Sequence, residues 1–141
     1  MEKLIEYGPL NLLTTLIWGE ARGEEYDGKC AVAFVVHNRL LDKRWPVTYE
    51  NVILQPKQFS CFNENDPNYH EIIKTLTPSR NGNWESMDYR ECRSAAYLIM
   101  GNWRKDITRG ANHYHARSVM PNWADPQKIT NVIGNHIFCK L

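Results

Sequence analysis

The chain has 141 residues, 23% of them charged, and a formal net charge of +1. That length builds one domain with its own core and without metal or disulfide support, and the near-neutral balance does not indicate a nucleic-acid partner. No apolar run is long enough to cross a membrane, so we expect no insertion into a bilayer. We also expect a single domain over residues 1–141 and a monomer.

The N-terminal residues and the cysteines carry no secretion or metal signature. Residues 1–9 contain neither a long apolar run nor a small-residue cleavage site, so no signal peptide is expected. The cysteines are widely spaced, without a Cys-x-x-Cys pair, which argues against a zinc knuckle or a redox motif. We expect four free thiols, two of them in helices as small core residues (Cys30 and Cys92) and two elsewhere (Cys61 and Cys139).

A first helix is predicted over residues 9–20, because Gly8-Pro9 is a favourable helix start. Leu13, Leu16 and Ile17 lie seven, four and three residues before Glu20, which is the spacing of one helical face. Glu20 should therefore emerge from an apolar face, where lost hydration raises the pKa of its carboxyl group and keeps it protonated as a general acid.

Glycines stand on both sides of this acid, at Gly19 and Gly23, and predict a backbone turn that a polymer can approach closely. The alternative is a solvated helix end in which Arg22 pairs with the surrounding glutamates, Glu24 among them. We favour the first interpretation, because a second apolar helix follows at once.

That second helix is predicted over residues 28–41, with Asp27 as its cap. Residues 30–36 are apolar on every side, which indicates a central, buried helix. Its polar end offers two interpretations for Asn38 and Arg39: they cap the helix and face solvent, or they brace Glu20 or Glu24.

The next segment is predicted as a short helix capped by Thr48 and ending near Leu54, then a loop over 55–58 and an extended strand to residue 62. In a strand, Gln58 and Ser60 would share one side and could bind a ligand, while Phe59 anchors the other side. A plain edge strand is the alternative.

The remaining elements run from helices to strands. We predict a helix over 69–76, a mobile surface loop over 78–84 and a helix over 89–100 that starts with the capping box Asp88/Glu91 and stops at Gly101. A loop over 106–111, a strand over 113–116 and a final hairpin over 132–140 follow. The fold class is therefore α+β, mainly helical, with a small antiparallel sheet.

Four segments of the chain resemble the SleB-type cell-wall hydrolases, known from spore-cortex lysis and phage lysins. They are Gly19-Glu20-Ala21-Arg22-Gly23-Glu24 with the helix to Arg39, then Gln58-Phe59-Ser60, then Asp106 to Tyr114, then Ile133-Gly134-Asn135-His136-Ile137-Phe138. They occur in the family's order and span nearly the whole chain.

This resemblance implies a lysozyme-like, two-lobed domain that cuts the glycan strands of peptidoglycan between MurNAc and GlcNAc, with Glu20 as the catalytic acid. The supporting or substrate-binding positions on this interpretation are Glu24, Arg39, Gln58, Phe59, Ser60, His113 and Tyr114. No cofactor and no metal are expected. A phage endolysin fits best, made in the host cytoplasm and acting on the wall after release.

The chemistry of such a cut depends on the number of carboxylates. Hydrolytic glycosidases usually use two, about 5 to 10 Å apart. A lytic transglycosylase needs one. It protonates the bridging oxygen as an acid and then serves as the base when the 6-hydroxyl of the muramic acid attacks. We expect Glu24 to hold the local fold through Arg22 or Arg39 rather than to act as a nucleophile, which favours the transglycosylase.

Two other functions remain open. His113 and His115 share one face of a strand and could bind zinc with His136 or Asp106, as in a metal-dependent amidase. Alternatively, the chain is a non-catalytic wall-binding protein with the same fold.

The sequence departs from the family pattern at three positions. Ile107 replaces a proline and Arg109 replaces a glycine in the loop after Asp106, so the shape of that loop is open. His37 stands where an aliphatic or uncharged residue is more usual.

Overall fold

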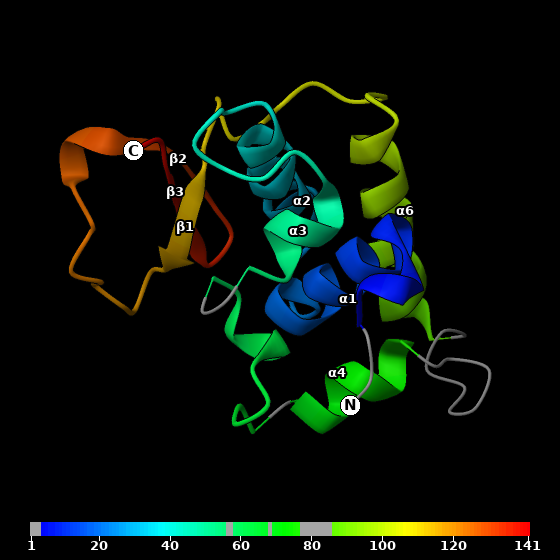
Figure 1. The fold of residues 1–141 in the computed structure, drawn as a ribbon. Coiled ribbons are helices and arrows are strands. Elements are labelled where there is room, and N and C mark those ends of the chain that lie inside the picture. Colours follow the sequence, from blue (N-terminus) through cyan, green and yellow to red (C-terminus); the bar gives the residue numbers. More distant parts are fainter. Residues whose placement is uncertain (1–3, 56–57, 68, 77–85) are drawn as a thin grey trace.

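The computed structural model describes residues 4–55, 58–67, 69–76 and 86–141, and it forms a helical body with a small sheet on one side (Figure 1). The helices, in chain order, are η1 (Leu4–Tyr7), α1 (Pro9–Ala21), α2 (Tyr26–Leu40), α3 (Tyr49–Ile53), η2 (Ser60–Phe62), α4 (Tyr69–Leu76), α6 (Met87–Met100) and η4 (Pro126–Lys128). The strands are β1 (His113–Ala116), β2 (Ile129–Ile133) and β3 (His136–Cys139). This is the predicted α+β, mainly helical class.

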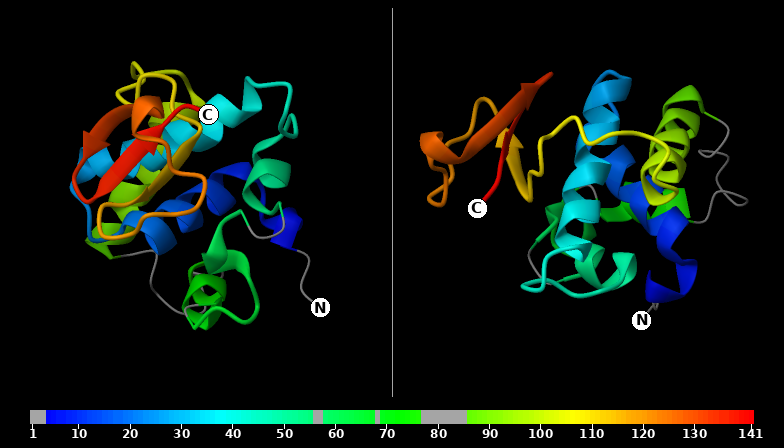
Figure 2. Two further views of the ribbon diagram at one scale, coloured as in Figure 1. Left: turned by 90° about the vertical axis from the view of Figure 1, so that its left-hand side faces the viewer. Right: turned by 90° about the horizontal axis from the view of Figure 1, so that it is seen from above.

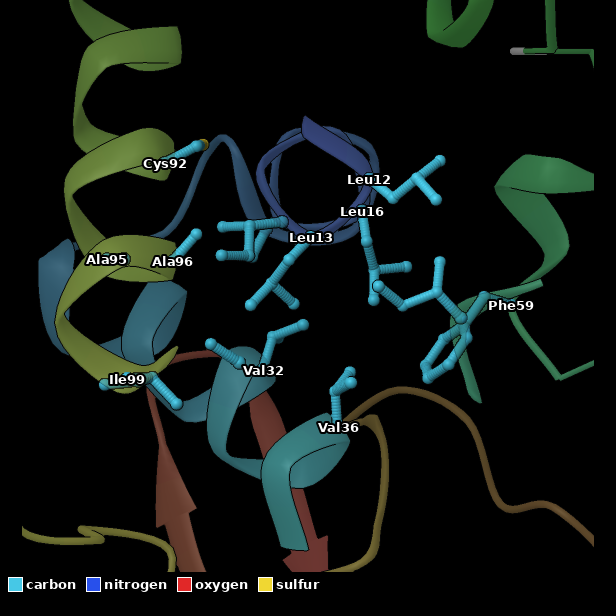
Figure 3. Packing of buried hydrophobic residues seen from close by; sticks show 14 of the residues in the cluster. Leu12, Leu13, Leu16, Val32, Val36, Phe59, Cys92, Ala95, Ala96 and Ile99 are labelled. Carbon is cyan, nitrogen blue, oxygen red and sulfur yellow. The ribbon is translucent and has the colours of Figure 1, made fainter. Parts of the chain in front are cut away.

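The centre of the molecule is α2, which lies between the sheet on one side and α1 and α6 on the other (Figure 2). Val32 and Val36 point toward α1, and they pack in the main core with Leu13 (Figure 3). A second apolar cluster joins α2 to the sheet, and its buried members are Ala31, Val35, Ala111 and Phe138. The helix is therefore apolar on every side because both halves of the domain pack on it, which confirms the predicted central helix.

The sheet is antiparallel with the order β1-β3-β2. Tyr114 pairs with Phe138, and both point toward α2. The hairpin between β2 and β3 turns at Gly134-Asn135, as predicted, although β2 begins at Ile129 rather than at Val132. The turn requires glycine at Gly134, because φ is +57° and a Cβ atom there would lie 2.8 Å from Glu24 Oε1.

Two predicted helix starts are wrong. Asp27 does not cap α2, which begins at Tyr26 after Glu25 without a side-chain cap; Asp27 lies in the first turn and pairs with Arg104 at 2.6 Å. The Asp88/Glu91 capping box does not start α6 either, because Ser86 Oγ accepts the Tyr89 N–H at 3.1 Å and starts the helix two residues earlier. Ser86, two residues before Asp88, is itself a favourable N-cap residue.

Other boundaries agree with the sequence. Thr48 caps α3, since its Oγ1 accepts the Asn51 N–H at 3.2 Å. Gly101 ends α6, and α4 has the predicted bounds. The predicted loop over 78–84 lies outside the described residues. His37 also has a structural explanation, because its Nδ1 lies 2.8 Å from the Tyr49 hydroxyl and so joins α2 to α3.

The predicted strand over 59–62 is absent, and η2 takes its place. None of the three described strands runs beside this segment. It packs instead over α1, where a Cβ atom on Gly19 would lie 2.6 Å from Ile72 Cδ1 and 3.1 Å from Cys61 Sγ. Gly19 therefore lies inside a helix and makes room for the protein's own side chains, so the predicted turn and polymer approach at this position are wrong.

The four cysteines are buried and free, which confirms the predicted thiols. None of the helices in the described ranges combines the length and the apolar character that a bilayer span requires.

Candidate active site

Glu20 lies in the last turn of α1, one turn after Leu16 and Ile17, which have no exposed surface. The acid itself is only partly buried, so it sits where the apolar face of α1 meets an open pocket. Burial raises the pKa of the Glu20 carboxyl group above 4.5, and the negative charge of Asp66 adds to the rise. Hydrogen bonds from Cys61 and Tyr114 partly oppose it. A protonated carboxyl group at this position is what a general acid requires.

Two neutral donors fix the Glu20 carboxyl group. Tyr114 comes from β1, and burial raises the pKa of its hydroxyl well above 10, so the proton stays on the oxygen. Cys61 comes from η2, and burial likewise raises the pKa of its thiol. The sheet and the helical body therefore each contribute one hydrogen bond to the same acid.

Glu20 opens into a pocket of about 260 Å³ between α1 and the β2–β3 hairpin. Its lining residues are Glu20, Ala21, Gly23, Glu24, Asn135 and His136. A Cβ atom on Gly23 would meet nothing within 4 Å, so this glycine leaves the rim open. A larger hollow of about 500 Å³ lies at the C-terminal end of α2, but it shares no residue with the pocket at Glu20. We place the candidate site at Glu20 because the acid with the raised pKa is there.

Glu24 lines the same pocket and is hydrogen-bonded to the hairpin between β2 and β3. Its Oε1 accepts the Asn135 backbone N–H at 2.8 Å, and its Oε2 accepts Asn135 Nδ2 at 3.0 Å. His136 Nδ1 lies 3.2 Å from Oε1, without the geometry of a hydrogen bond. The expected partners do not hold this carboxylate: Arg22 stacks on Trp18, with its guanidinium carbon 4.1 Å from the ring centroid.

Arg39 is buried and organises the opposite wall. Its Nε donates to the Asn112 carbonyl at 2.8 Å, and its Nη1 donates to Gln58 Oε1 at 3.3 Å. Its guanidinium lies over the rings of Trp45 and Phe59, at 5.3 and 5.2 Å from their centroids. Burial lowers the pKa of Arg39 to about 10, so the group stays charged at neutral pH. Arg39 thus joins the 58–59 segment to the residue before β1 rather than bracing a carboxylate.

The other predicted site residues are distributed around this wall. Phe59 is buried in the main core and Gln58 is exposed, while Ser60 begins η2. His113 points to the face of β1 opposite Tyr114, where its ring centroid lies 5.9 Å from that of Trp45 and 5.0 Å from that of Trp123. Burial and the nearby arginines lower the pKa of His113 to about 4.

The structure gives no support to a zinc site at His113 and His115. Within residues 4–55, 58–67, 69–76 and 86–141, no three His, Cys, Asp or Glu side chains come together as metal ligands. His115 Nδ1 lies 2.8 Å from the Ala116 carbonyl, and His136 lies on the other face of the sheet, beside Tyr114. Asp106 instead accepts four hydrogen bonds, from its own loop and from Asn38.

The loop after Asp106 is well defined despite its departures from the family pattern. One Asp106 oxygen accepts the N–H and the hydroxyl of Thr108, and the other accepts Gly110 N–H and Asn38 Nδ2. These hydrogen bonds outweigh the effect of burial and lower the pKa of Asp106. Arg109 adopts φ +59°, in the left-handed region that favours glycine. The carboxylate therefore holds the loop in a shape that costs energy at Arg109.

Sequence reasoning missed two contributors to the site. The sequence predicts Cys61 only as a free thiol. Its position next to Glu20 depends on η2, which forms where the sequence predicts a strand. His136 was considered only as a zinc ligand. Its place in the fourth motif, two residues before the buried Phe138 on the same strand face, could have indicated that it points toward Tyr114.

Comparisons with known proteins identify the family of this chain. Residues 23–139 match the family model described as Cell Wall Hydrolase. The spore cortex-lytic enzyme of Oceanobacillus iheyensis is 30% identical over 93% of this chain and 41% of its own length. That of Bacillus cereus is 30% identical over 93% of this chain and 44% of its own length. The chain therefore spans less than half the length of these curated relatives.

Two solved structures resemble the whole domain. The catalytic domain of the germination-specific lytic transglycosylase SleB from Bacillus anthracis has a TM-score of 0.68 and 26% identity, covering 94% of this chain and 93% of that one. The catalytic domain of the Bacillus cereus SleB protein has a TM-score of 0.66 and 27% identity, covering 94% and 89%. With a family model that matches most of its length, the chain belongs to the cell wall hydrolase family.

Proposed function

We propose that this chain cleaves the glycan strands of peptidoglycan between MurNAc and GlcNAc, with Glu20 as the general acid and then the general base. The observation that carries the proposal is a carboxyl group with a raised pKa, held by Tyr114 and Cys61 at the edge of an open pocket. The likeness to domains described as catalytic domains of SleB, one of them called a lytic transglycosylase, supports the same chemistry.

The surroundings of Glu24 favour a lytic transglycosylase over a two-carboxylate hydrolase. Glu24 is the other carboxylate of the pocket, but both its oxygens accept hydrogen bonds from Asn135. A nucleophile or a base needs a free lone pair toward the sugar, so Glu24 is better suited to hold the hairpin. Glu20 then gives its proton to the bridging oxygen, and the electron pair of the broken C1–O bond leaves with that oxygen. The 6-hydroxyl oxygen of the same muramic acid bonds to C1, and its proton returns to the Glu20 carboxylate.

The test is Glu20→Gln, which keeps the size of the side chain but cannot supply the proton. We expect the rate of glycan cleavage to fall by about 10²-fold or more, while binding to purified peptidoglycan is kept. Mass spectrometry of the wild-type products should show 1,6-anhydro ends, which lack one water relative to hydrolysed ends. Equal lysis by the Glu20→Gln variant would instead favour a wall-binding protein, and loss of activity in excess chelator that zinc alone restores would favour the amidase.

We further propose that the enzyme works as a monomeric phage endolysin, made inside the host bacterium and acting on the wall after release. The support is the resemblance of its motifs to a family that includes phage lysins. Light scattering after size-exclusion chromatography should give the mass of one chain. Cells that express the protein should lyse when the membrane is permeabilised and not before. Lysis without permeabilisation would contradict release by a second factor.

A further inference from the structure

A second hollow continues the pocket at Glu20 along the surface. It has a volume of about 460 Å³ and lies between the first turn of α2 and the turn of the β2–β3 hairpin; we call it the hairpin hollow. Gly23, Glu24 and Asn135 line both hollows, which therefore form one trough. The hairpin hollow alone has the volume of a ligand pocket, about 300 to 1,000 Å³, so the trough can hold more than the group on which Glu20 acts.

Glu24 forms the floor of this trough where the two hollows meet. Its side chain is only 9% exposed, and its carboxylate accepts the N–H and Nδ2 of Asn135 at 2.8 and 3.0 Å. Two glycines make room for it: a Cβ atom on Gly28 would lie 2.8 Å from Glu24 Cβ, and one on Gly134 would lie 2.8 Å from Glu24 Oε1. The carboxylate therefore lies low between α2 and the hairpin and leaves the trough open above it.

Gly23 borders the trough at the same place, but no contact among the described residues requires a glycine there. A Cβ atom on Gly23 would meet nothing within 4 Å, and its φ is not positive. Every other glycine in the described ranges has either a positive φ or a close neighbour. Because the fold accepts a side chain at this position, the space left open there is available to a ligand.

The walls of the hairpin hollow suit an uncharged sugar better than a stem peptide. Glu25 is exposed there, and Asp27 pairs with Arg104 at 2.6 Å. Ionised carboxylates accept hydrogen bonds from sugar hydroxyls, and Ile133 offers an apolar surface to a sugar ring. Stem peptides carry carboxylates of their own, which Glu25 repels. A neutral stretch of the glycan strand is therefore the occupant that these residues favour.

We propose that the glycan strand runs from Glu20 across Gly23 into the hairpin hollow, and that Gly23 is a specificity-determining residue, because its missing side chain lets sugar units beyond the cut bind there. This inference rests on the proposed glycan cleavage and adds the path of the strand to it. Sugars bound away from the broken bond help to hold that bond at Glu20, so strands long enough to reach the hairpin hollow should be the better substrates.

The first experiment narrows the trough with Gly23→Leu and compares long, peptide-free glycan strands with the shortest fragment that the wild type cleaves. We expect KM for the long strands to rise about tenfold or more with kcat changed little, because the substitution removes binding and leaves the acid in place. Cleavage of the short fragment should change by less than about twofold. The alkaline limb of the pH–rate profile, which reports Glu20, should not move, and the melting temperature should not fall.

The matched control is Ser118→Leu. It adds the same side chain at an exposed residue that lines neither hollow, and it should keep the wild-type KM for both substrates. A rise in KM with this variant would show that any added leucine disturbs binding, and the result with Gly23→Leu would then not support the path.

The second experiment measures binding without cleavage. Because the four native cysteines are buried, Gly23→Cys introduces an exposed thiol that a maleimide labels selectively. In a Glu20→Gln background, peptide-free strands at about ten times their Kd should slow this labelling about tenfold, since only the free protein reacts. Ser118→Cys in the same background should label equally fast with and without strands. Free stem peptides should protect neither thiol.

The proposal is overturned by a folded Gly23→Leu variant with the wild-type KM for long strands, by an equal loss on long and short substrates, or by labelling of Gly23→Cys that bound strands do not slow. Protection by stem peptides but not by strands would assign the hairpin hollow to the peptide and overturn it as well. If Gly23→Leu does not fold, the labelling experiment decides. A wild type that cleaves no glycan contradicts the proposed function instead, and the labelling then still reports whether strands bind across Gly23.

Discussion

Replacing Lys29 by methionine tests how α2, α6 and the turn at Glu24 are held together. Lys29 lies in the first turns of α2 and is 2% exposed, yet it carries a charge. Its Nζ donates to the Glu24 carbonyl at 2.9 Å and to Glu91 Oε2 on α6 at 2.8 Å. The substitution keeps most of the buried aliphatic stem and removes the ammonium group with both hydrogen bonds.

The expected loss follows from the burial of each partner. Removing one member of a fully buried ion pair costs about 3 to 5 kcal/mol, because the other charge is left without a partner. Here the remaining partner is Glu91, which is 42% exposed and regains hydration from solvent. We therefore expect a smaller loss, about 2 kcal/mol in the free energy of unfolding, most of it from the Glu24 carbonyl and the charge-assisted bond.

Urea unfolding followed by tryptophan fluorescence measures this loss, and a domain of this size should show a melting temperature lower by roughly 5 to 10 °C. The control is Lys74→Met, whose ion pair with Glu71 at 3.2 Å is about half exposed on both sides and should contribute under about 0.5 kcal/mol. Equal, small losses in the two variants would refute the argument that the buried lysine links α2, α6 and the turn at Glu24.

Three further outcomes follow from the site. Because the folded state raises the pKa of Glu20, ionisation of its carboxyl group destabilises the fold as pH rises above 4.5. Glu20→Gln should therefore be more stable than the wild type at pH 8 and equal to it near pH 4 in urea unfolding, and equal stability at both pH values would contradict this. Arg109→Gly should raise stability by about 1 kcal/mol, since glycine adopts φ +59° without strain, and a lower melting temperature would contradict this. Cys61→Ala removes a hydrogen bond that lowers the pKa of Glu20, so the alkaline limb of the pH–rate profile should move to higher pH, whereas an unmoved limb would show that the thiol does not contact the acid.

The parts of the fold that follow from local patterns could be predicted from the sequence. The face leading to Glu20 and the all-apolar run of α2 both depend on side-chain periodicity, and both agree with the structure. The hairpin turn at Gly134-Asn135 is likewise a local signal. The predicted helix starts at Asp27 and Asp88 are wrong because several possible capping residues stand close together there. Tertiary contacts, which a local pattern does not contain, then determine where the helix begins.

The composition of the site depends on contacts that no local pattern contains. Cys61 reaches Glu20 only because η2 packs where Gly19 has no side chain, and Glu24 meets Asn135 across more than a hundred residues. The sequence indicated that Glu24 has a structural role, but it suggested arginine partners, since charge alone favours them. A turn amide at the end of a distant hairpin supplies the hydrogen bonds instead.

The four buried thiols affect how the protein tolerates oxidants. Burial raises the pKa of every one of them, that of Cys92 to about 12, so hardly any thiolate exists while the domain stays folded. Thiolate is the reactive species, and the native domain should therefore survive air and mild peroxide without losing sulfhydryl groups. Unfolding by heat or urea should expose the four thiols, and oxidation would then allow mispaired disulfides that hinder refolding. Recovery after denaturation should accordingly depend on added reductant, and the rate of labelling by a thiol reagent reports how often the molecule opens.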